Sequence, residues 1–270
     1  MTVTALLAAC VTCVDATSPR RAAAPRIAVM APLVYVCARP QQGAAAAEYE
    51  SFRTSARLDS VDLERLDLVT QELPADAFTR WRGFVVGGSP YNLTDPESTK
   101  TDVQRRLEAG LATIATAAAG GETAALFTCY GIGVATRTLG GEVSRGYPED
   151  TGPTAITLTE EGRRDRVFGG LADRFSALTA HKEGTERMPA GAVLLATNDA
   201  CPVQSYRVGD RLYATQFHPE PTAQAFTERM AVYRDDGYFE ARDYDTISAR
   251  VLAASLTEPP RILQAFARAF

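Results

Sequence analysis

Apolar runs and helix-forming segments alternate along the first half of the chain. Continuous apolar runs are typical of strands covered on both faces of a parallel sheet. They predict strands at residues 26–30, 66–73, 83–90 and 122–128. Helices are expected at 44–56, at 96–117 and from Tyr130 to the glycine pair 140–141. This order predicts an α/β fold with an open, mostly parallel sheet flanked by helices.

The second half of the chain predicts more strands and then helices. The strands are expected at 154–159, 192–198, 202–208 and 211–217. The last two flank a Gly-Asp pair, which is a hairpin signal. Helices are expected at about 221–234, 243–255 and 259–269. No internal repeat or long linker interrupts this order, so we expect a single domain over 25–270, after a poorly ordered leader over 1–24.

Composition and charge exclude several classes of function. The 270 residues are 46% apolar and 23% charged, which is ordinary for a globular protein. A formal net charge of -5 argues against a nucleic-acid surface, which needs a basic patch. No apolar run approaches the roughly 20 residues of a membrane span. We therefore expect a small-molecule substrate, with neither nucleic acid nor membrane as a partner.

The cysteines indicate a reducing compartment. Five cysteines, an odd number scattered along the chain, do not make a disulfide scaffold. Cys10 and Cys13 form the one close pair, and no second ligand pair or nearby histidine accompanies them. We predict a cytoplasmic protein without a metal site, in which Cys37 and Cys201 are structural.

Cys129 lies between a predicted strand and a predicted short helix, in the stretch LFTCYGIGVA at 126–135. A nucleophile elbow has this arrangement, with the reactive group on the sharp turn. Gly131 keeps the trailing glycine of that motif, whereas Phe127 stands at the leading glycine. Amides and the helix dipole at a helix N-terminus favour a thiolate. A small cysteine packed in the core is an equally good interpretation of this stretch alone.

The stretch ATQFHPE at 214–220 supplies a candidate base. The chain has two histidines, His181 and His218. His218 and Glu220 are two residues apart in an extended segment, so their side chains leave the same face. Glu220 can orient one ring nitrogen and leave the other for the thiol of Cys129, which makes a Cys-His-Glu triad. The alternative is a surface histidine beside a solvated glutamate.

Gly87 and Gly88 end the predicted strand at 83–90. Without side chains, they let backbone amides approach a ligand closely. Such an amide, together with that of Tyr130, predicts an oxyanion hole. No Lys-Ser or Lys-Thr follows, so the run is not a phosphate-binding loop. Two glycines after a strand also simply form a turn.

Taken in order, GGSPYN, TCYGIG and QFHPE resemble the class I glutamine amidotransferase family, in particular domains like the amidotransferase part of GMP synthase. The resemblance spans about residues 26–235 and implies a flavodoxin-like fold with no cofactor. It implies that a thiolate attacks the side-chain amide of glutamine, that a γ-glutamyl thioester forms, and that ammonia and then glutamate leave. Cys129 would be the nucleophile, His218 the base and acid, and Glu220 its orienting partner. The amides of Gly88 and Tyr130 would donate to the oxyanion.

The chain departs from the family pattern beside the nucleophile. The family usually has G-x-C-x-G-x-Q, whereas Phe127 and Gly133 replace the outer glycine and the glutamine here. Losing the glutamine removes a side chain near the amino-acid end of the substrate. A γ-glutamyl compound other than glutamine is therefore a rival substrate. We expect Gly87 and Gly133 beside the substrate, and His181 falls where relatives often carry a histidine near the active site.

Two alternative functions remain open at this point. A γ-glutamyl peptidase or hydrolase of small γ-glutamyl conjugates would keep the triad and change the substrate. A catalytically quiet binding domain would keep the fold alone. The chain continues for about 50 residues past QFHPE in helical sequence, so no synthase domain is expected within it. If ammonia is transferred, a separate synthase or acceptor subunit is the expected partner.

Overall fold

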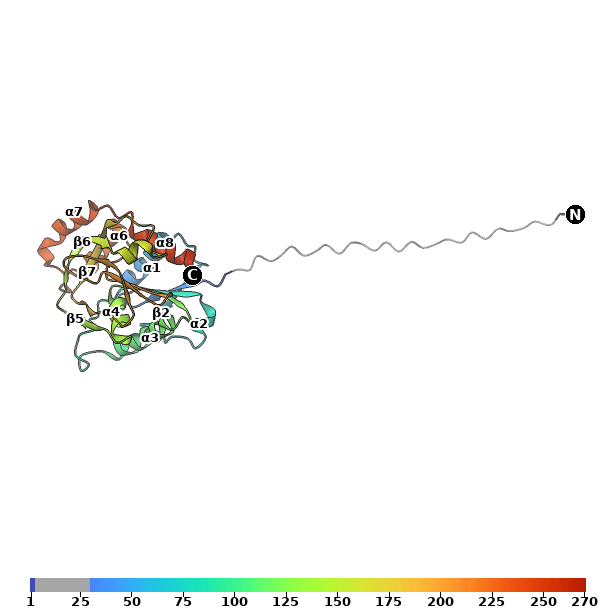
Figure 1. Ribbon diagram of the computed structural model, residues 1–270, viewed down its shortest axis with the longest axis horizontal. Helices are drawn as coiled ribbons and strands as arrows, with labels where there is room; N and C mark the ends of the chain where they lie inside the picture. The colour runs from blue at the N-terminus through green and yellow to red at the C-terminus, as the bar shows by residue number, and fades with distance from the viewer. Residues whose placement is uncertain (3–29) are drawn as a thin grey trace. The chain divides into compact units, whose positions relative to one another are not determined.

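A nine-stranded sheet runs through the computed structural model, which describes residues 1–2 and 30–270 (Figure 1). The strand order is β2 (Leu63–Asp67), β1 (Leu33–Cys37), β3 (Gly83–Val86), β4 (Ala124–Thr128), β11 (Leu212–Thr215), β10 (Ser205–Val208), β9 (Val193–Thr197), β6 (Glu149–Leu158) and β7 (Arg174–His181). The first five strands in this order, from β2 through β1, β3 and β4 to β11, are parallel to one another. The other four, β10, β9, β6 and β7, each run antiparallel to the strand before them. Strands β5 (Glu142–Ser144) and β8 (Gly184–Arg187) form a small separate sheet. The predicted α/β fold with a parallel core is confirmed.

Helices cover both faces of the sheet, as Figure 1 shows. They are α1 (Gln42–Ala56), α2 (Ala77–Arg80), α3 (Asp102–Ala119), α4 (Tyr130–Thr138), α5 (Glu160–Arg164), α6 (Ala223–Val232), α7 (Tyr244–Leu252) and α8 (Pro259–Ala269), with a short 3-10 helix at Ala241–Asp243. Within residues 30–270, none of these helices has the length and apolar character needed to cross a membrane.

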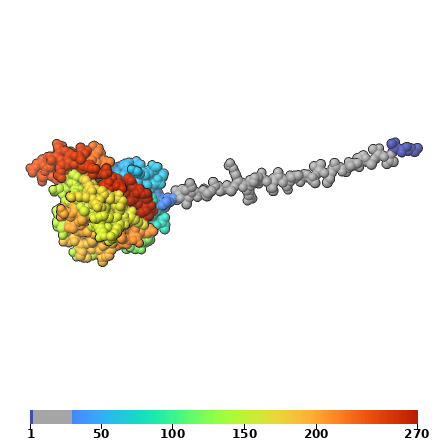
Figure 2. Space-filling model, turned by 45° about the horizontal axis from the view of Figure 1, so that its top comes forward, coloured from blue at the N-terminus to red at the C-terminus, as the bar shows by residue number. Residues whose placement is uncertain are grey.

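The sheet separates two hydrophobic cores because side chains alternate along each strand. Val34 and Val36 of β1 pack with α3 and α4 on one face. Leu33 and Tyr35 point to the other face, where they pack with α1 and α8. Figure 2 shows α8, in red, at the surface beside the light blue α1. Residues 31–270 form one compact unit.

Several predicted element boundaries were wrong for physical reasons. Strand β1 at 33–37 was not predicted. The strand predicted at 26–30 stays a prediction, because 26–29 lie outside the described residues, as do residues 3–24 of the predicted leader and the Cys10–Cys13 pair. The strand predicted at 66–73 stops at Asp67 because its only partner, β1, ends at Cys37. The helix predicted from residue 96 begins at 102, where the Thr101 side chain accepts a hydrogen bond from Gln104 N–H.

The antiparallel part of the sheet was predicted only in part. The hairpin of β10 and β11 is confirmed, with Gly209 in its turn at φ +56°. Strand β6 begins at Glu149, five residues before the predicted start. Its first residues, which include Gly152 and Pro153, pair with β7 in an irregular register. Strand β7 was not predicted, since polar residues interrupt its apolar pattern.

The carboxyl ends of β3, β4 and β11 lie side by side and position the candidate residues. Thr128 at the end of β4 pairs with Thr215 of β11, and the Cys129 N–H donates to Thr215 O at 2.9 Å. On the other side, Thr128 Oγ1 donates to Val86 O of β3 at 2.8 Å. This pairing puts the residues after all three strands at one edge of the sheet, where ligands bind in open α/β folds.

Helix α4 packs tightly on the sheet only because residue 131 is a glycine. A Cβ at Gly131 would lie 3.2 Å from Phe127 Cβ and 3.3 Å from Val86 Cγ1, and both of these side chains are fully buried. A Cβ at Gly133, half a turn further, would meet no atom closer than Leu93 Cδ2 at 3.4 Å. The helix start is therefore seated close to β4 by the absence of a side chain at 131.

We predict that Gly131→Ala lowers the free energy of unfolding by about 1–3 kcal/mol, because the added methyl overpacks a rigid contact. Gly133→Ala is the matched control, and should leave stability unchanged or raise it by up to about 1 kcal/mol through helix propensity. Urea unfolding at equilibrium measures both values. Equal effects of the two changes would contradict the close packing of α4 on β4.

Candidate active site

Cys129 sits on a strained turn between β4 and α4. Its backbone has φ +50° and ψ -108°, and only Arg57 among the other described non-glycine residues has a positive φ. Such a conformation costs of order 1–3 kcal/mol and persists where the surrounding structure imposes it. Here the hydrogen bond to Thr215 O and the packing of α4 impose it. This is the strand–turn–helix geometry predicted for an elbow.

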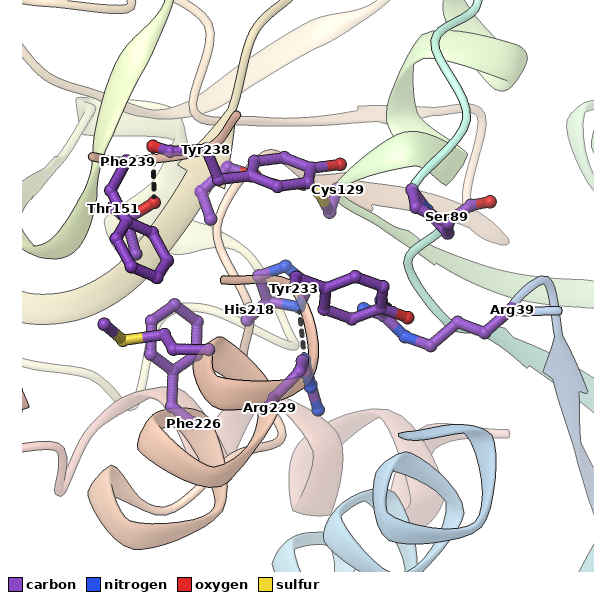
Figure 3. Close-up of a pocket in the computed structure, with 13 residues that line it drawn as sticks. Arg39, Ser89, Cys129, Thr151, His218, Phe226, Arg229, Tyr233, Tyr238 and Phe239 are labelled. Carbon is purple, nitrogen blue, oxygen red and sulfur yellow. Dashed lines mark hydrogen bonds between the residues drawn. The ribbon is translucent and has the colours of Figure 1, made fainter. Parts of the chain in front are cut away.

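The side chain of Cys129 is not sealed in the core. The residue is 8% exposed and lines two neighbouring cavities. The first, here called the His218 cavity, is also lined by His218, Phe226, Met230, Tyr233 and Phe239 (Figure 3). The second, the Gly133 cavity, is also lined by Tyr130, Gly133, His181, Glu183 and Asn92. Cys129 therefore lies at the boundary of two small cavities and is not packed on all sides by the core.

His218 lies beside Cys129 and is held by Glu220. The backbone N–H of His218 donates to Leu178 O of β7 at 2.9 Å. The ring Nδ1 lies 3.0 Å from Glu220 Oε1, and Glu220 is fully buried. This contact leaves Nε2 as the ring nitrogen for the cavity that His218 shares with Cys129. The structure thus places His218 in contact with Glu220 and in one cavity with Cys129.

Electrostatics favour a protonated imidazole in this site. Burial by itself lowers the pKa of His218, but the charge of Glu220, the charge of Cys129 and hydrogen bonds to both raise that pKa to about 9. Burial likewise raises the pKa of the Glu220 carboxyl, yet the cations His218 and Arg229 outweigh it and hold this pKa below its usual value. At neutral pH the pair is therefore an imidazolium beside a carboxylate.

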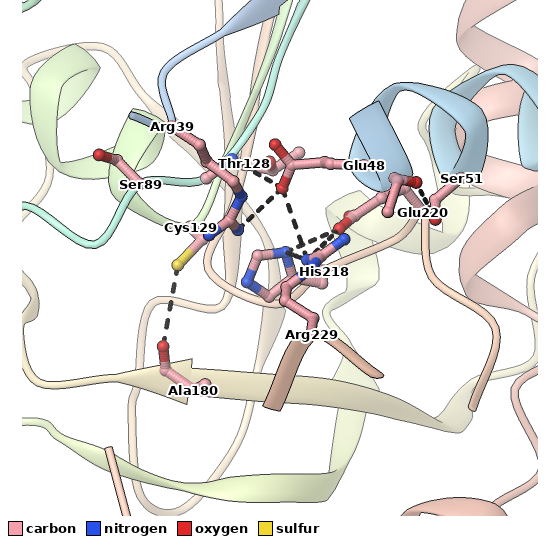
Figure 4. A network of polar contacts seen from close by, with 12 residues as sticks. Arg39, Glu48, Ser51, Ser89, Thr128, Cys129, Ala180, His218, Glu220 and Arg229 are labelled. Carbon is pink, nitrogen blue, oxygen red and sulfur yellow. Dashed lines mark hydrogen bonds and ion pairs between the residues drawn. The ribbon is translucent and has the colours of Figure 1, made fainter. Parts of the chain in front are cut away.

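A buried network of charges surrounds this pair (Figure 4). Arg229 Nη1 lies 2.8 Å from Glu220 Oε1 and 3.5 Å from Glu48 Oε1. Arg39 Nη2 in turn lies 2.8 Å from Glu48 Oε1. Two acids and two arginines thus compensate one another next to His218.

Sequence reasoning missed Glu48, Arg39 and Arg229. One signal was available for Glu48, because it lies four residues after Ala44 and four before Phe52 on the apolar face of α1. A glutamate on the buried face of a helix needs a charged partner. Nothing in the sequence identified its partners, since Arg39 and Arg229 come from distant segments.

The first predicted oxyanion donor is the backbone amide of Gly88, in the loop after β3. Gly88 packs against the imidazole, since a Cβ there would lie 3.0 Å from His218 Cε1. Its N–H, however, donates to Glu48 Oε1 at 3.3 Å. Neither Gly87 nor Gly88 lines either cavity, whereas the next residue, Ser89, lines both. Gly88 is thus needed for close approach, and its amide is already engaged by a carboxylate.

The remaining predicted residues lie in the Gly133 cavity. Tyr130 and Gly133 line it from α4. His181 lines it too, but its ring nitrogens already lie 3.0 Å from Glu183 O and 2.8 Å from Glu149 Oε2. His181 therefore fixes the wall of the cavity through both nitrogens.

In the part of the chain that the structure describes, two groups of side chains have donor atoms close enough for a metal ion. They are Glu48, His218 and Glu220, and Glu149, His181 and Cys201, with all donor atoms of a group within 4.8 Å. The first group is held by the arginine ion pairs. In the second, burial and the charge of Glu149 raise the pKa of Cys201 to about 12, which favours the neutral thiol.

A model of the family described as glutamine amidotransferase class-I matches residues 66–232, well over half of the chain. The chain therefore belongs to the class I glutamine amidotransferase family.

Individual relatives match shorter segments. GMP synthase (glutamine-hydrolyzing) of Aeropyrum pernix is 33% identical over 92 residues, which cover 34% of this chain and 17% of that protein. Gamma-glutamyl peptidase 3 of Arabidopsis thaliana is 28% identical over 96 residues, 34% of this chain and 39% of that protein. The chain thus spans well under half the length of these relatives.

Solved structures agree on the fold. A glutamine amidotransferase from Thermotoga maritima superposes with a TM-score of 0.69 at 16% identity, covering 89% of this chain and 98% of that one. A glutamine amidotransferase from Methylobacillus flagellatus gives a TM-score of 0.67 at 16% identity, covering 89% and 94%.

We predict that NMR titration places the pKa of His218 near 9, against about 6.5 for an unperturbed histidine. Glu220→Gln should lower the pKa of His218 strongly. Burial lowers this pKa, and the substitution removes the carboxylate charge that opposes the effect of burial. Glu228→Gln, an exposed change on α6, is the matched control and should have no effect.

The same shift makes stability depend on pH. Because the folded pKa of His218 lies above its unfolded value, the stabilisation by Glu220 is fully present below about pH 6.5 and is lost as the pH rises through about 9. The difference in unfolding free energy between the wild type and Glu220→Gln should narrow over this range. A wild-type pKa near 6.5 would contradict the buried ion pair.

Proposed function

We propose that the chain hydrolyses the side-chain amide of glutamine, or of a related γ-glutamyl compound, with Cys129 as nucleophile. The observation that carries this proposal is the cavity shared by Cys129 and His218, with Glu220 on the far side of the ring. A nucleophile, a base and an orienting acid at this spacing are the minimum for acyl transfer by a thiol.

Acylation follows from the positions of these groups. His218 holds the proton of the Cys129 thiol, and the sulfur attacks the amide carbon to form a C–S bond. His218 then gives that proton to the leaving nitrogen, the C–N bond breaks, and ammonia or an amine departs. A γ-glutamyl thioester remains on Cys129.

Deacylation reverses the proton transfers. Water attacks the thioester while His218 removes one of its protons. The C–S bond breaks, the sulfur takes the proton back, and glutamate leaves. The raised pKa of His218 supports its role as the acid of the first half, because the ring is protonated at neutral pH.

The amide of Tyr130 is our proposed donor to the oxyanion, since it follows the nucleophile at the start of α4. The amide of Gly88 can join it only by leaving Glu48. Ser89, which lines both cavities, presents the next amide of the same loop. The donor set is therefore Tyr130 with Gly88 or Ser89.

A γ-glutamyl peptidase is the second candidate. Gly133 replaces the glutamine that the family usually carries, and it lies in the wall of the Gly133 cavity. The relative named gamma-glutamyl peptidase 3 also supports this substrate class. A catalytically quiet binding domain is the remaining alternative.

Partners and location stay predictions. If ammonia is transferred, a separate synthase subunit supplies the acceptor site, as the likeness to a segment of GMP synthases suggests. The cytoplasmic location rests on the odd number of cysteines.

We expect Cys129→Ala to lower glutamate release by about 10⁴-fold or more, because the nucleophile is lost while the backbone sets the turn. Cys37→Ala is the control. Cys37 is fully buried in the core between the sheet and helices α1 and α8, and burial raises the pKa of its thiol. Glutamate release is measured with glutamine and with γ-glutamyl dipeptides.

A substrate preference separates the two enzymatic candidates, and no release from any γ-glutamyl compound supports the quiet domain. Full activity in Cys129→Ala would overturn the proposed mechanism.

A further inference from the structure

The two cavities that Cys129 lines lie on either side of the bond to be cleaved, so each can hold one half of a substrate. If Cys129 and His218 act as proposed, the amide carbon lies at the sulfur and the leaving nitrogen must reach His218 for its proton. His218 lines only the first cavity, and Tyr130, the proposed oxyanion donor, lines only the second. The leaving amine therefore belongs in the His218 cavity, and the γ-glutamyl group in the Gly133 cavity.

The His218 cavity is walled by apolar and aromatic side chains. Phe226 and Met230 of α6 are 2% and 4% exposed, and Phe239 closes the same side (Figure 3). Tyr233 and Tyr238 also line the cavity, with the Tyr238 ring beside Cys129 in this view, and Tyr238 lines the Gly133 cavity as well. These side chains enclose a small cavity of about 40 Å³, part of which is open to solvent.

Polar contacts hold this wall in place, and one of them comes from Thr151, which itself lines the cavity. Thr151 Oγ1 of β6 donates to Tyr238 O at 3.1 Å. Lys182 Nζ donates to Asp236 O at 2.8 Å and also lies 4.5 Å from the centre of the Tyr238 ring. Asp236 and Tyr238, in the segment between α6 and α7, are therefore each anchored by a hydrogen bond to the sheet side of the cavity.

The charges of this cavity are already compensated. Arg39 and Arg229 line it, but Arg39 is paired with Glu48 and Arg229 with Glu220. Within residues 30–270, each arginine that lines the cavity therefore has a carboxylate partner, and His218 is held by Glu220. Ammonia has no apolar surface to bury, so this wall contributes nothing to the release of ammonia from glutamine. An apolar group gains about 25 cal/mol for each Å² that it buries there.

We infer that the preferred substrate is a γ-glutamyl amide of an uncharged, apolar or aromatic amine. This inference rests on the proposed function and specifies its leaving group. The amine occupies the His218 cavity, where Met230 and Phe239 contact its apolar part and His218 protonates its nitrogen. The products are glutamate and the free amine.

The test compares four substrates that share the γ-glutamyl group. They are glutamine, γ-glutamylmethylamide, γ-glutamylphenethylamide and γ-glutamylphenylalanine. Glutamate release gives kcat/KM for each. The phenethylamide should exceed both glutamine and the methylamide by about tenfold or more, because burial of its ring is the added interaction. The phenylalanine conjugate adds only a carboxylate to the phenethylamide and should be cleaved more slowly.

A variant of the wall tests where the preference arises. Met230→Gln keeps the length of the side chain and makes the wall polar, so it should lower the ratio of phenethylamide to methylamide kcat/KM about fivefold or more. Met230→Leu should keep that ratio. Val232→Thr, a polar change at an exposed site of the same helix, is the matched control and should leave all rates unchanged. If Met230→Gln does not fold, Phe239→Gln makes the same test.

The outcomes separate this inference from the function on which it rests. Glutamate release from every amide with no preference for the phenethylamide would overturn the inference and keep the hydrolase. If the ratio of phenethylamide to methylamide kcat/KM is unchanged in a folded Met230→Gln or Phe239→Gln variant, the leaving amine does not bind in the His218 cavity. If the phenylalanine conjugate is cleaved faster than the phenethylamide, the preference for an uncharged leaving group is wrong. Release from none of the four would overturn the hydrolase as well.

Discussion

The parallel pairing of β4 with β11 is the constraint on which the site depends. It joins two segments about ninety residues apart, and the hydrogen bond from Cys129 N–H to Thr215 O continues the pairing past the end of β4. The turn at Cys129 is strained, so the sheet on one side and Gly131 on the other must hold it. A thiol and an imidazole thereby meet at one edge of the sheet without any flexible loop to bring them together.

Burying charges at this edge requires that they compensate one another. Isolated charges in an interior are strongly unfavourable, and removing one partner of a buried pair costs about 3–5 kcal/mol. Glu48, Glu220, Arg39 and Arg229 satisfy this requirement around His218. The compensation leaves the imidazole able to carry a proton beside Glu220, while both arginines of the adjoining cavity keep a carboxylate partner. The same arrangement therefore supports an acid for the leaving nitrogen and an apolar site for its substituent.

The sequence predicted those parts of the structure that depend on local pattern. The elbow at Cys129, the spacing of His218 and Glu220 and the last helix all follow from neighbouring residues. Strand pairing does not, which is why the strand predicted at 66–73 was too long and β7 was missed. Glu48 could have been noticed on the apolar face of α1, but its partners come from other segments and only the fold brings them together. The engagement of the Gly88 amide by Glu48 is likewise a consequence of tertiary contact.

The central claim is that His218 and Glu220 activate the sulfur of Cys129, and the rate of alkylation of that sulfur tests it most directly. Iodoacetamide at neutral pH should modify Cys129 much faster than the buried Cys37 and Cys201, as mass spectrometry of each cysteine peptide would show. His218→Ala should remove this advantage. Alkylation of Cys129 at the rate of Cys37 and Cys201, or at an unchanged rate without His218, would contradict the account.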